Sequence, residues 1–215
     1  MFENQTYTLK YRMIHLIKFS KPLILSLFGL ILFSGCNNKN YIIKSDFATY
    51  TEGWTITGDA QGDFSEPSYA SEGGVTDGYI FADDDIQGGV WYFTAPDTYL
   101  GYKNEFYGAI LRFSLLQESK MSRQFVSDDI ILKNGNNQIT YIFDKENYPG
   151  KNWTDYEVKI SADQGWFKGG YNSKVKATEA EIKGILFNIT QFSIRGEFET
   201  GPDTGALDHV IISKK

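Results

Sequence analysis

Acidic side chains are the residues of this sequence best suited to bind a metal ion. Asp83, Asp84 and Asp85 form the densest cluster of carboxylates in the chain. Because Ca²⁺ takes about six to eight oxygen ligands, this run is a candidate calcium site, and a solvated turn is the alternative. A glycosidase pair is a weaker interpretation, because neighbouring residues of a strand point to opposite faces and do not easily flank one bond.

Aromatic side chains are the second group that could bind a ligand. Phe, Tyr and Trp make up 16% of the chain, and their flat rings can stack on the rings of sugars. Trp153 and Trp166 lie close to expected loops, and Tyr92 points away from Trp91 if both belong to a strand. We therefore name Tyr92, Trp153 and Trp166 as candidate ligand-binding residues. Burial in the core is the alternative for each tryptophan, and we expect it for Trp54 and Trp91.

Residues for covalent or acid–base catalysis are scarce. The chain has one cysteine and two histidines, and His209 is the one histidine outside the N-terminal segment. A lone histidine beside Asp208 makes neither a triad nor a His-rich metal site, and no nucleotide-binding or nucleophile motif occurs. We therefore predict no catalytic residues and no enzymatic activity. A formal net charge of −6 also argues against nucleic acid as a partner.

The N-terminal segment has the pattern of an export signal. Four basic residues precede an uncharged apolar run at 22–33, which is too short to span a bilayer. The run leads into Leu-Phe-Ser-Gly-Cys at 32–36, which resembles a bacterial lipobox. That resemblance implies cleavage before Cys36 and lipidation of its thiol. We predict a lipoprotein signal peptide at 1–35.

The predicted lipid anchor indicates where the protein acts. Two or more acyl chains hold a protein firmly to a membrane, so Cys36 would fix the chain to the cell envelope. Asn37 replaces the aspartate that usually retains such proteins at the inner membrane, which indicates the outer membrane, facing the periplasm or the cell surface. A tether is expected at 36–44. The start codon is Met1 or Met13, since the second gives a more typical signal length.

Short alternating segments, broken by glycine, aspartate and asparagine, predict an all-β domain at 45–215. Within one of them, Tyr156, Val158 and Ile160 share one side and charged residues share the other. Seven or more such segments occur, so an antiparallel β-sandwich or jelly roll is the expected architecture.

One short helix is expected to close an end of this sandwich. Thr178 and Glu181 have the spacing of a capping box, and Ile182, Ile185 and Leu186 follow on one face.

An ordered series of motifs carries a family resemblance. It comprises Gly-Val-Trp-Tyr-Phe-Thr-Ala-Pro at 89–96, Tyr-Leu-Gly at 99–101, Tyr-Gly-Ala-Ile-Leu-Arg-Phe at 107–113, Asp-Ile-Ile-Leu-Lys-Asn-Gly-Asn at 129–136, Trp-Thr-Asp-Tyr-Glu-Val-Lys-Ile at 153–160, Phe-Ser-Ile-Arg at 192–195 and Gly-Ala-Leu-Asp-His-Val at 205–210. In order and spacing the series resembles the laminin B domain, also called laminin domain IV, over about residues 46–213. Tyr102 and Ala109 depart from the common pattern of that family.

The resemblance implies a galactose-binding-like β-sandwich of extracellular proteins, without enzymatic activity and without one settled ligand. In jelly rolls of this type the first and last strands lie close together, and a structural Ca²⁺ often sits between them. Asp46 and Asp208 fall on those strands and are therefore candidate calcium ligands. A hydrogen bond from each aspartate to the backbone is the alternative.

We therefore expect a lipid-anchored, non-catalytic module of the cell envelope that binds carbohydrate or an extracellular protein. A structural subunit of an envelope complex is the main alternative, and it predicts a large exposed apolar patch. A glycan-active enzyme is the weaker alternative, since it requires two carboxylates about 5–9.5 Å apart in a cleft.

Overall fold

The computed structural model describes residues 41–60, 64–84, 88–119 and 123–214. Thirteen strands, one α-helix and four short 3-10 helices are found there. The strands are β1 (Tyr41–Ser45), β2 (Thr55–Thr57), β3 (Phe64–Ser65), β4 (Ser68–Ala70), β5 (Tyr79–Asp84), β6 (Tyr92–Thr94), β7 (Ile110–Ser119), β8 (Ile130–Asn134), β9 (Asn137–Tyr141), β10 (Thr154–Lys159), β11 (Phe167–Lys168), β12 (Gln191–Arg195) and β13 (Asp203–Ser213). The helices are η1 (Asp97–Tyr99), η2 (Asn104–Phe106), η3 (Lys145–Asn147), η4 (Ala162–Gln164) and α1 (Glu179–Leu186).

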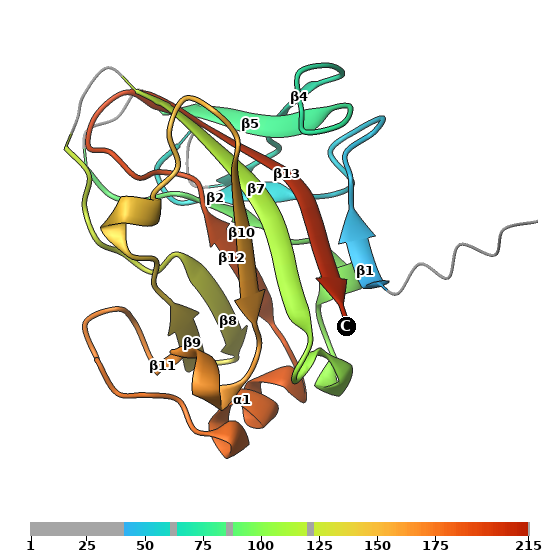
Figure 1. Ribbon diagram of the computed structural model, residues 1–215, viewed down its shortest axis with the longest axis vertical. Coiled ribbons are helices and arrows are strands. Elements are labelled where there is room, and N and C mark those ends of the chain that lie inside the picture. Colours follow the sequence, from blue (N-terminus) through green and yellow to red (C-terminus); the bar gives the residue numbers. More distant parts are fainter. Residues whose placement is uncertain (1–40, 61–63, 85–87, 120–122, 215) are drawn as a thin grey trace, which may run out of the picture. The chain divides into compact units, whose positions relative to one another are not determined.

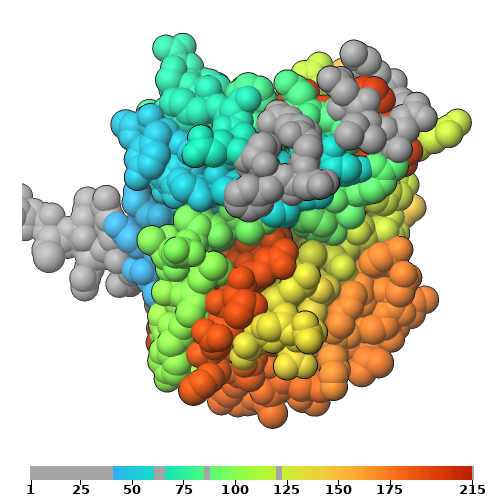
Figure 2. Space-filling view, turned by 180° about the vertical axis from the view of Figure 1, so that it is seen from behind, coloured from blue at the N-terminus to red at the C-terminus, as the bar shows by residue number. Residues whose placement is uncertain are grey.

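The strands form two antiparallel sheets (Figure 1). Sheet A has the order β10-β7-β13-β5-β4, and β1 also pairs with β13. Sheet B has the order β11-β9-β8-β12-β6-β2-β3, and its outer side is seen in Figure 2. This arrangement confirms the predicted antiparallel β-sandwich.

The core lies between the inner faces of the two sheets. In β7, Leu111, Phe113 and Leu115 are buried and point inward, while Arg112 alternates with them and points outward. In β10, Tyr156 and its neighbour two residues later are buried in the same way, as the period of two predicts. Because alternate residues of a strand face opposite sides, one outward row of polar side chains is left on sheet A.

Aromatic rings fill much of the core, and three of the four tryptophans are fully buried. Trp54 and Trp91 are among them, which confirms the prediction for both. The ring of Trp54 packs edge-on against Tyr99 and Phe192, at 5.4 and 6.1 Å between centroids. Rings at these separations gain some electrostatic attraction beyond the burial of their area.

The helix α1 forms where the capping box predicts it. The Glu181 backbone N–H donates to the Thr178 side chain, and the Thr178 N–H donates to the Glu181 carboxylate. Ile182, Ile185 and Leu186 are buried on one face. In Figure 1 the helix lies below β8 and β9, so it covers that end of the sandwich as expected.

The ordered domain begins earlier than the sequence predicts. Residues 41–44 were expected to be part of a tether, but they belong to β1, which pairs with β13 from Tyr41↔Ser213 to Ser45↔Val210. Ile42 and Ile43 are half-buried against the core. This packing and the hydrogen bonds to β13 together hold residues 41–45 to sheet A.

The predicted signal peptide and the lipidation site Cys36 lie outside the described residues. Among the residues that are described, no helix is both long enough and apolar enough to cross a membrane.

Candidate functional site

The structure separates the three aromatic residues proposed as ligand contacts. Trp166 is 0% exposed, its Nε1 donates to the Lys159 carbonyl at 3.0 Å, and its ring lies 5.5 Å from that of Tyr141. Its proposed contact with a sugar is therefore wrong. The turn before it carries Gly165 at φ +89° and directs the indole into the core.

Tyr92 lies on sheet B, on the opposite side of the sandwich from Trp153. It points away from the buried Trp91, as expected, and is half-buried. Its hydroxyl lies 3.2 Å from the Ser127 hydroxyl, and burial raises the pKa of Tyr92 to about 12. Tyr92 and Trp153 therefore cannot contribute to one binding site.

Trp153 is the candidate that lies in a site-like environment. Its ring packs edge-on against Tyr79 at 5.3 Å, and Tyr79 in turn contacts Phe81 at 5.8 Å. All three rings are half-buried and lie on the outer side of sheet A. The Trp153 Nε1 donates to the Gly73 carbonyl at 2.9 Å, which fixes the indole and links β10 to the loop between β4 and β5. We call Tyr79, Phe81 and Trp153 the aromatic platform.

A hollow of about 410 Å³ opens on the same side of sheet A. Its lining residues come from β7, β10, β13 and the loop after β4: Val75, Arg112, Phe113, Ser114, Asp155, Tyr156, Glu157, His209 and Ile211. We call this the sheet A hollow.

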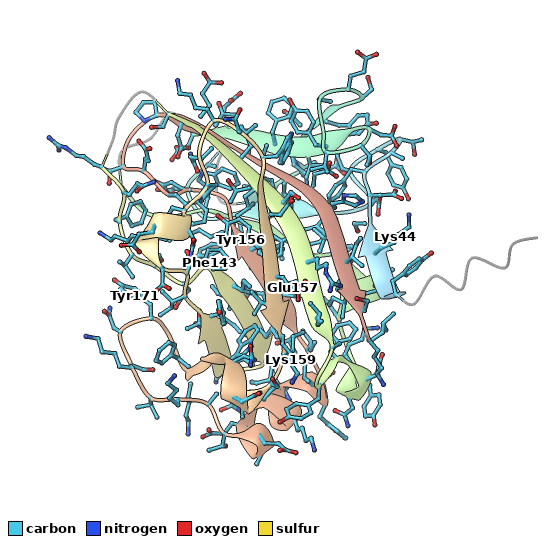
Figure 3. The ribbon with its side chains drawn as sticks, in the orientation of Figure 1. Lys44, Phe143, Tyr156, Glu157, Lys159 and Tyr171 are labelled. Carbon is cyan, nitrogen blue, oxygen red and sulfur yellow. The ribbon has the colours of Figure 1, made fainter. Side chains whose placement is uncertain are left out.

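The polar side chains of the sheet A hollow hold one another in place. The Arg112 Nε donates to the Glu157 carboxylate at 2.9 Å, and Ser114 donates to Asp155 at 2.6 Å. These pairs face one another across the β7–β10 register, and Figure 3 labels Glu157 on β10. Donors and acceptors of this kind, close to aromatic rings, suit the hydroxyl groups and the apolar faces of a saccharide.

Asp46 and Asp208, the candidate calcium ligands, each have protein partners. Asp208 is buried and accepts from the backbone N–H groups of Val75 at 2.7 Å and His209 at 2.6 Å; burial raises its pKa. Asp46 pairs with Lys44, whose hydrogen bond lowers the pKa of that carboxyl. The first and last strands are adjacent, as expected. Asp208 matches the alternative of a hydrogen bond to the backbone, whereas Asp46 pairs with a lysine side chain. Calcium at this pair stays a prediction.

A different group of carboxylates meets where the two sheets come together at one end. One oxygen each from Asp59, Asp84 and Glu197 lies within 4.8 Å of the others. Burial and the carboxylates of Asp203, Asp59 and Asp84 raise the pKa of Glu197 to about 8. Burial and Asp84 raise the pKa of Asp203 to about 7. We call these four residues the acidic cluster.

Only part of the acidic cluster can be recognised from the sequence. Asp84 stands in the acidic run singled out at the start, and alternation sends it inward while Asp83 points outward and accepts from Thr204 at 2.6 Å. Glu197 and Asp203 carry no motif. Glu197 and Asp203 come close to the other carboxylates because the chain passes from β12 in sheet B to β13 in sheet A. No local pattern encodes that crossing.

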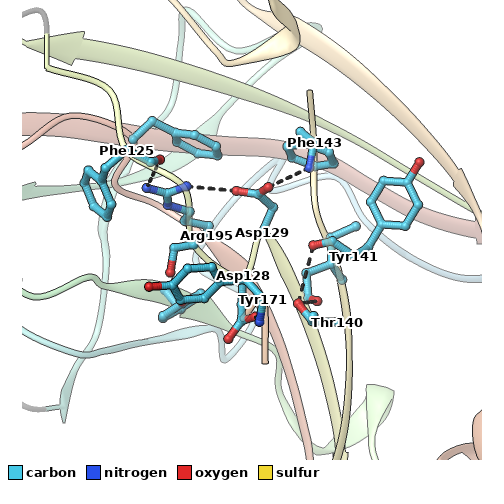
Figure 4. A network of polar contacts seen from close by, with 12 residues as sticks. Phe125, Asp128, Asp129, Thr140, Tyr141, Phe143, Tyr171 and Arg195 are labelled. Atoms are coloured by element: carbon cyan, nitrogen blue, oxygen red, sulfur yellow. Dashed lines mark hydrogen bonds and ion pairs between the residues drawn. The ribbon is translucent and has the colours of Figure 1, made fainter. Parts of the chain in front are cut away.

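A buried ion pair joins Arg195, at the end of β12, to Asp129 (Figure 4). Arg195 and Asp129 are fully buried, and the Arg195 Nη1 donates to the Asp129 carboxylate at 3.0 Å. The guanidinium also donates to the Phe125 carbonyl at 3.0 Å, and its carbon lies 4.3 Å from the centroid of the Phe125 ring. The Phe143 N–H donates to Asp129 at 2.6 Å. These bonds engage both carboxylate oxygens of Asp129 and both Nη atoms of Arg195, away from solvent.

Comparisons with known proteins agree with this architecture. A model of the laminin B (domain IV) family matches residues 92–214. The laminin-like protein lam-2 of Caenorhabditis elegans is 31% identical over 123 residues, which make up 55% of this chain and 7% of that protein. The chain therefore matches only a small part of that relative's length.

Solved structures with the same fold include binding domains. The L4b domain of human laminin alpha-2 superposes with a TM-score of 0.64 at 14% identity, covering 81% of this chain and 98% of that domain. The family 11 carbohydrate-binding module of the cellulase Lic26A-Cel5E of Clostridium thermocellum gives 0.50 at 12% identity, covering 80% and 94%. At such identities the likeness shows the fold.

Proposed function

The chain belongs to the laminin B (domain IV) family, and from that premise we propose that it is a lipid-anchored binding module of the cell envelope whose sheet A face takes carbohydrate. The aromatic platform beside the sheet A hollow is the observation that carries this proposal. It offers ring faces and hydrogen-bonding groups on one surface, which is the usual make-up of a small-ligand site.

The rigidity of the platform supports a binding role. The Trp153 indole is held by its bond to Gly73, and Tyr79 abuts it at an interplanar angle of 79°. A ring that is already fixed loses little conformational entropy when a ligand stacks on it. The carbohydrate-binding modules among the solved relatives show that this fold can host such a function.

The carboxylates of the sheet A hollow favour binding over hydrolysis. Glu157 is paired with Arg112 and Asp155 accepts from Ser114, so each is engaged as an acceptor. A glycosidase needs one carboxyl that carries a proton and a second that stays ionised. Asp155 and Glu157 both lie on the edge strand β10, and their hydrogen bonds hold them in position to accept from sugar hydroxyls.

The lipid anchor at Cys36 rests on the sequence pattern. Four residues separate Cys36 from Tyr41, the first residue of β1. Since an extended chain spans at most about 3.6 Å per residue, the module would stay close to the membrane that the lipid enters. We propose the outer membrane as that location, on the grounds of Asn37.

A protein partner is the second candidate function, favoured by one exposed pair of rings. Tyr102 and Phe187 are each 62% exposed, and their centroids lie 5.7 Å apart near the end of α1. Exposed neighbouring aromatics suit a protein interface. A structural subunit of an envelope complex would use this pair rather than the platform.

A binding screen on the full chain in mild detergent separates the two functions. Immobilised glycans and polysaccharides would be tested against wild type, Trp153→Ala and Tyr102→Ala. The proposal predicts saturable binding to one glycan class that Trp153→Ala abolishes and Tyr102→Ala leaves unchanged. An absence of binding by folded wild type, or equal binding by Trp153→Ala, would contradict it.

A further inference from the structure

The acidic cluster brings together carboxylates from four separate parts of the fold. Asp84 ends β5 and Asp203 begins β13, both in sheet A. Asp59 follows β2, and Glu197 follows β12, both in sheet B. The cluster therefore lies where the two sheets meet, and a ligand held there would join them.

Glu197 is the side chain that points to a bound ligand. It is 0% exposed, and neither of its carboxylate oxygens has a hydrogen-bond partner among the described residues. Both oxygens of Asp59 are likewise shielded from solvent and without such a partner. A buried polar group normally finds a hydrogen bond, because leaving it unsatisfied costs about 1–3 kcal/mol or more for a charged group.

Direct salt bridges of the described residues do not neutralise Asp59, Glu197 or Asp203, although the charge of Arg195 offsets part of the rise that burial causes in the pKa of Glu197. Among the described residues, no ion pair joins Asp59, Glu197 or Asp203 to a lysine or arginine. Arg195, two residues before Glu197, donates its hydrogen bonds to Asp129 and the Phe125 carbonyl. Asp59, Glu197 and Asp203 therefore have no bonded cation among the described residues.

The backbone around Asp59 is built to let a carboxylate approach closely. Gly89 has φ +91°, and a Cβ placed on it would overlap the Asp59 carboxylate. A glycine at this position avoids both the overlap and the strain of a positive φ. The backbone at Gly89 therefore leaves room for the Asp59 carboxylate, which a side chain at that position would displace.

We propose that Asp59, Asp84 and Glu197 hold a divalent cation, Ca²⁺, with Asp203 beside it. Each carboxylate offers two oxygens, and Ca²⁺ accepts mono- and bidentate carboxylates in flexible geometry. Mg²⁺ demands a stricter octahedron and keeps several of its waters, so it fits a site of converging protein carboxylates less well. A hollow of about 330 Å³ borders Asp84 and Asp203 and provides room for water ligands and for entry.

This site is distinct from the sheet A hollow, and its role would be to link the sheets. The cation would bridge β5 of sheet A to the segments after β2 and β12 of sheet B. A ligand that binds the folded state and not the unfolded state stabilises the fold in proportion to its concentration. The inference does not depend on glycan binding.

Calorimetric titration of the chelator-treated full chain with CaCl₂ tests the proposal directly. Wild type should bind about one Ca²⁺ per chain, and calcium at a hundred times Kd should raise Tm by roughly 5–10 °C. Glu197→Gln keeps the size of the side chain and removes its charge, so its affinity should fall at least tenfold. Glu146→Gln, which makes the same change at an exposed position, should behave as wild type.

A melting curve in chelator shows whether the Glu197→Gln variant still folds. Because glutamine cannot ionise, Glu197→Gln avoids the repulsion that a second buried charge beside Asp59 and Asp203 would add, so this variant should melt at or above the wild-type temperature in chelator. A lower Tm in chelator would contradict the proposed charge imbalance. The proposal would also be overturned if folded wild type bound no calcium, or if Glu197→Gln bound it as tightly as wild type.

Discussion

Replacing Arg195 with methionine should destabilise the protein strongly at neutral pH. Among the described residues, Arg195 is the one cation bonded to the buried Asp129, and methionine keeps most of the side-chain volume but none of the charge. The change leaves an uncompensated carboxylate in the core. Breaking one half of a buried pair costs about 3–5 kcal/mol.

This loss is large against the total stability of such a domain. Proteins of this kind have free energies of unfolding of about 5–15 kcal/mol, so the loss is about a fifth of the total or more. The corresponding fall in Tm is about 6–20 °C, at roughly 2–4 °C per kcal/mol for a chain of this size. The contacts of the guanidinium with the rings of Phe125 and Phe198, at 4.3 and 4.5 Å, add to the cost.

The pH dependence should change as well. Burial raises the pKa of Asp129 to about 6 even with Arg195 beside it. A carboxyl whose pKa is higher in the folded state contributes stability below its unfolded pKa, and that contribution is lost as pH rises through the folded value. Without Arg195 the folded pKa rises further, so Arg195→Met should recover part of its stability at pH 5 relative to pH 8.

Urea unfolding followed by tryptophan fluorescence measures these effects, since three indoles are fully buried. The double variant Asp129→Asn with Arg195→Met should be more stable than Arg195→Met alone at pH 8, because no charge is left unpaired. A loss under about 1 kcal/mol in Arg195→Met would refute the reasoning, as would equal stability of the single and double variants.

Three further outcomes follow from local geometry and the proposed cation. Thr178→Ala removes the capping box of α1 and should lower the free energy of unfolding by about 0.5–2 kcal/mol in urea titrations; no change would contradict the capping role. Gly196→Ala should lower the free energy of unfolding by about 1–3 kcal/mol, because the added Cβ would overlap the Trp91 ring. Gly184→Ala, on the exposed side of α1, should raise it by up to about 1 kcal/mol. A stable Gly196→Ala protein would show that Trp91 can shift. Chelation should lower the Tm of wild type by more than that of Glu197→Gln, and equal shifts would remove the case for a bound cation.

Local patterns in the sequence were sufficient for the elements that depend on neighbours along the chain. The alternation around Tyr156 and Val158 placed the correct face of β10 inward, and the Thr178–Glu181 spacing located α1. Both signals come from contacts within a few residues, which is why they can be read without the fold. The ordered motifs along 89–210 predicted the laminin B fold correctly, because they are spread over most of the strands.

Features that depend on the meeting of distant segments were missed or misplaced. The orientation of Trp166 is set by the turn at Gly165, and local composition alone suggested an exposed loop. The segment at 41–44 looked like a tether because its pairing partner, β13, lies some 170 residues away. The acidic cluster joins four segments of two sheets, and Asp84 is its one member for which the sequence predicted a metal site.

The most direct test of the proposed function is the binding of glycans by wild type and by Trp153→Ala, with Tyr102→Ala as the control. Trp153 holds the aromatic platform against the loop at Gly73, while Tyr102 is an exposed ring at the far end near α1. The proposal predicts saturable binding to one glycan class, lost in Trp153→Ala and kept in Tyr102→Ala. Binding that survives Trp153→Ala, or that is lost only in Tyr102→Ala, would contradict it.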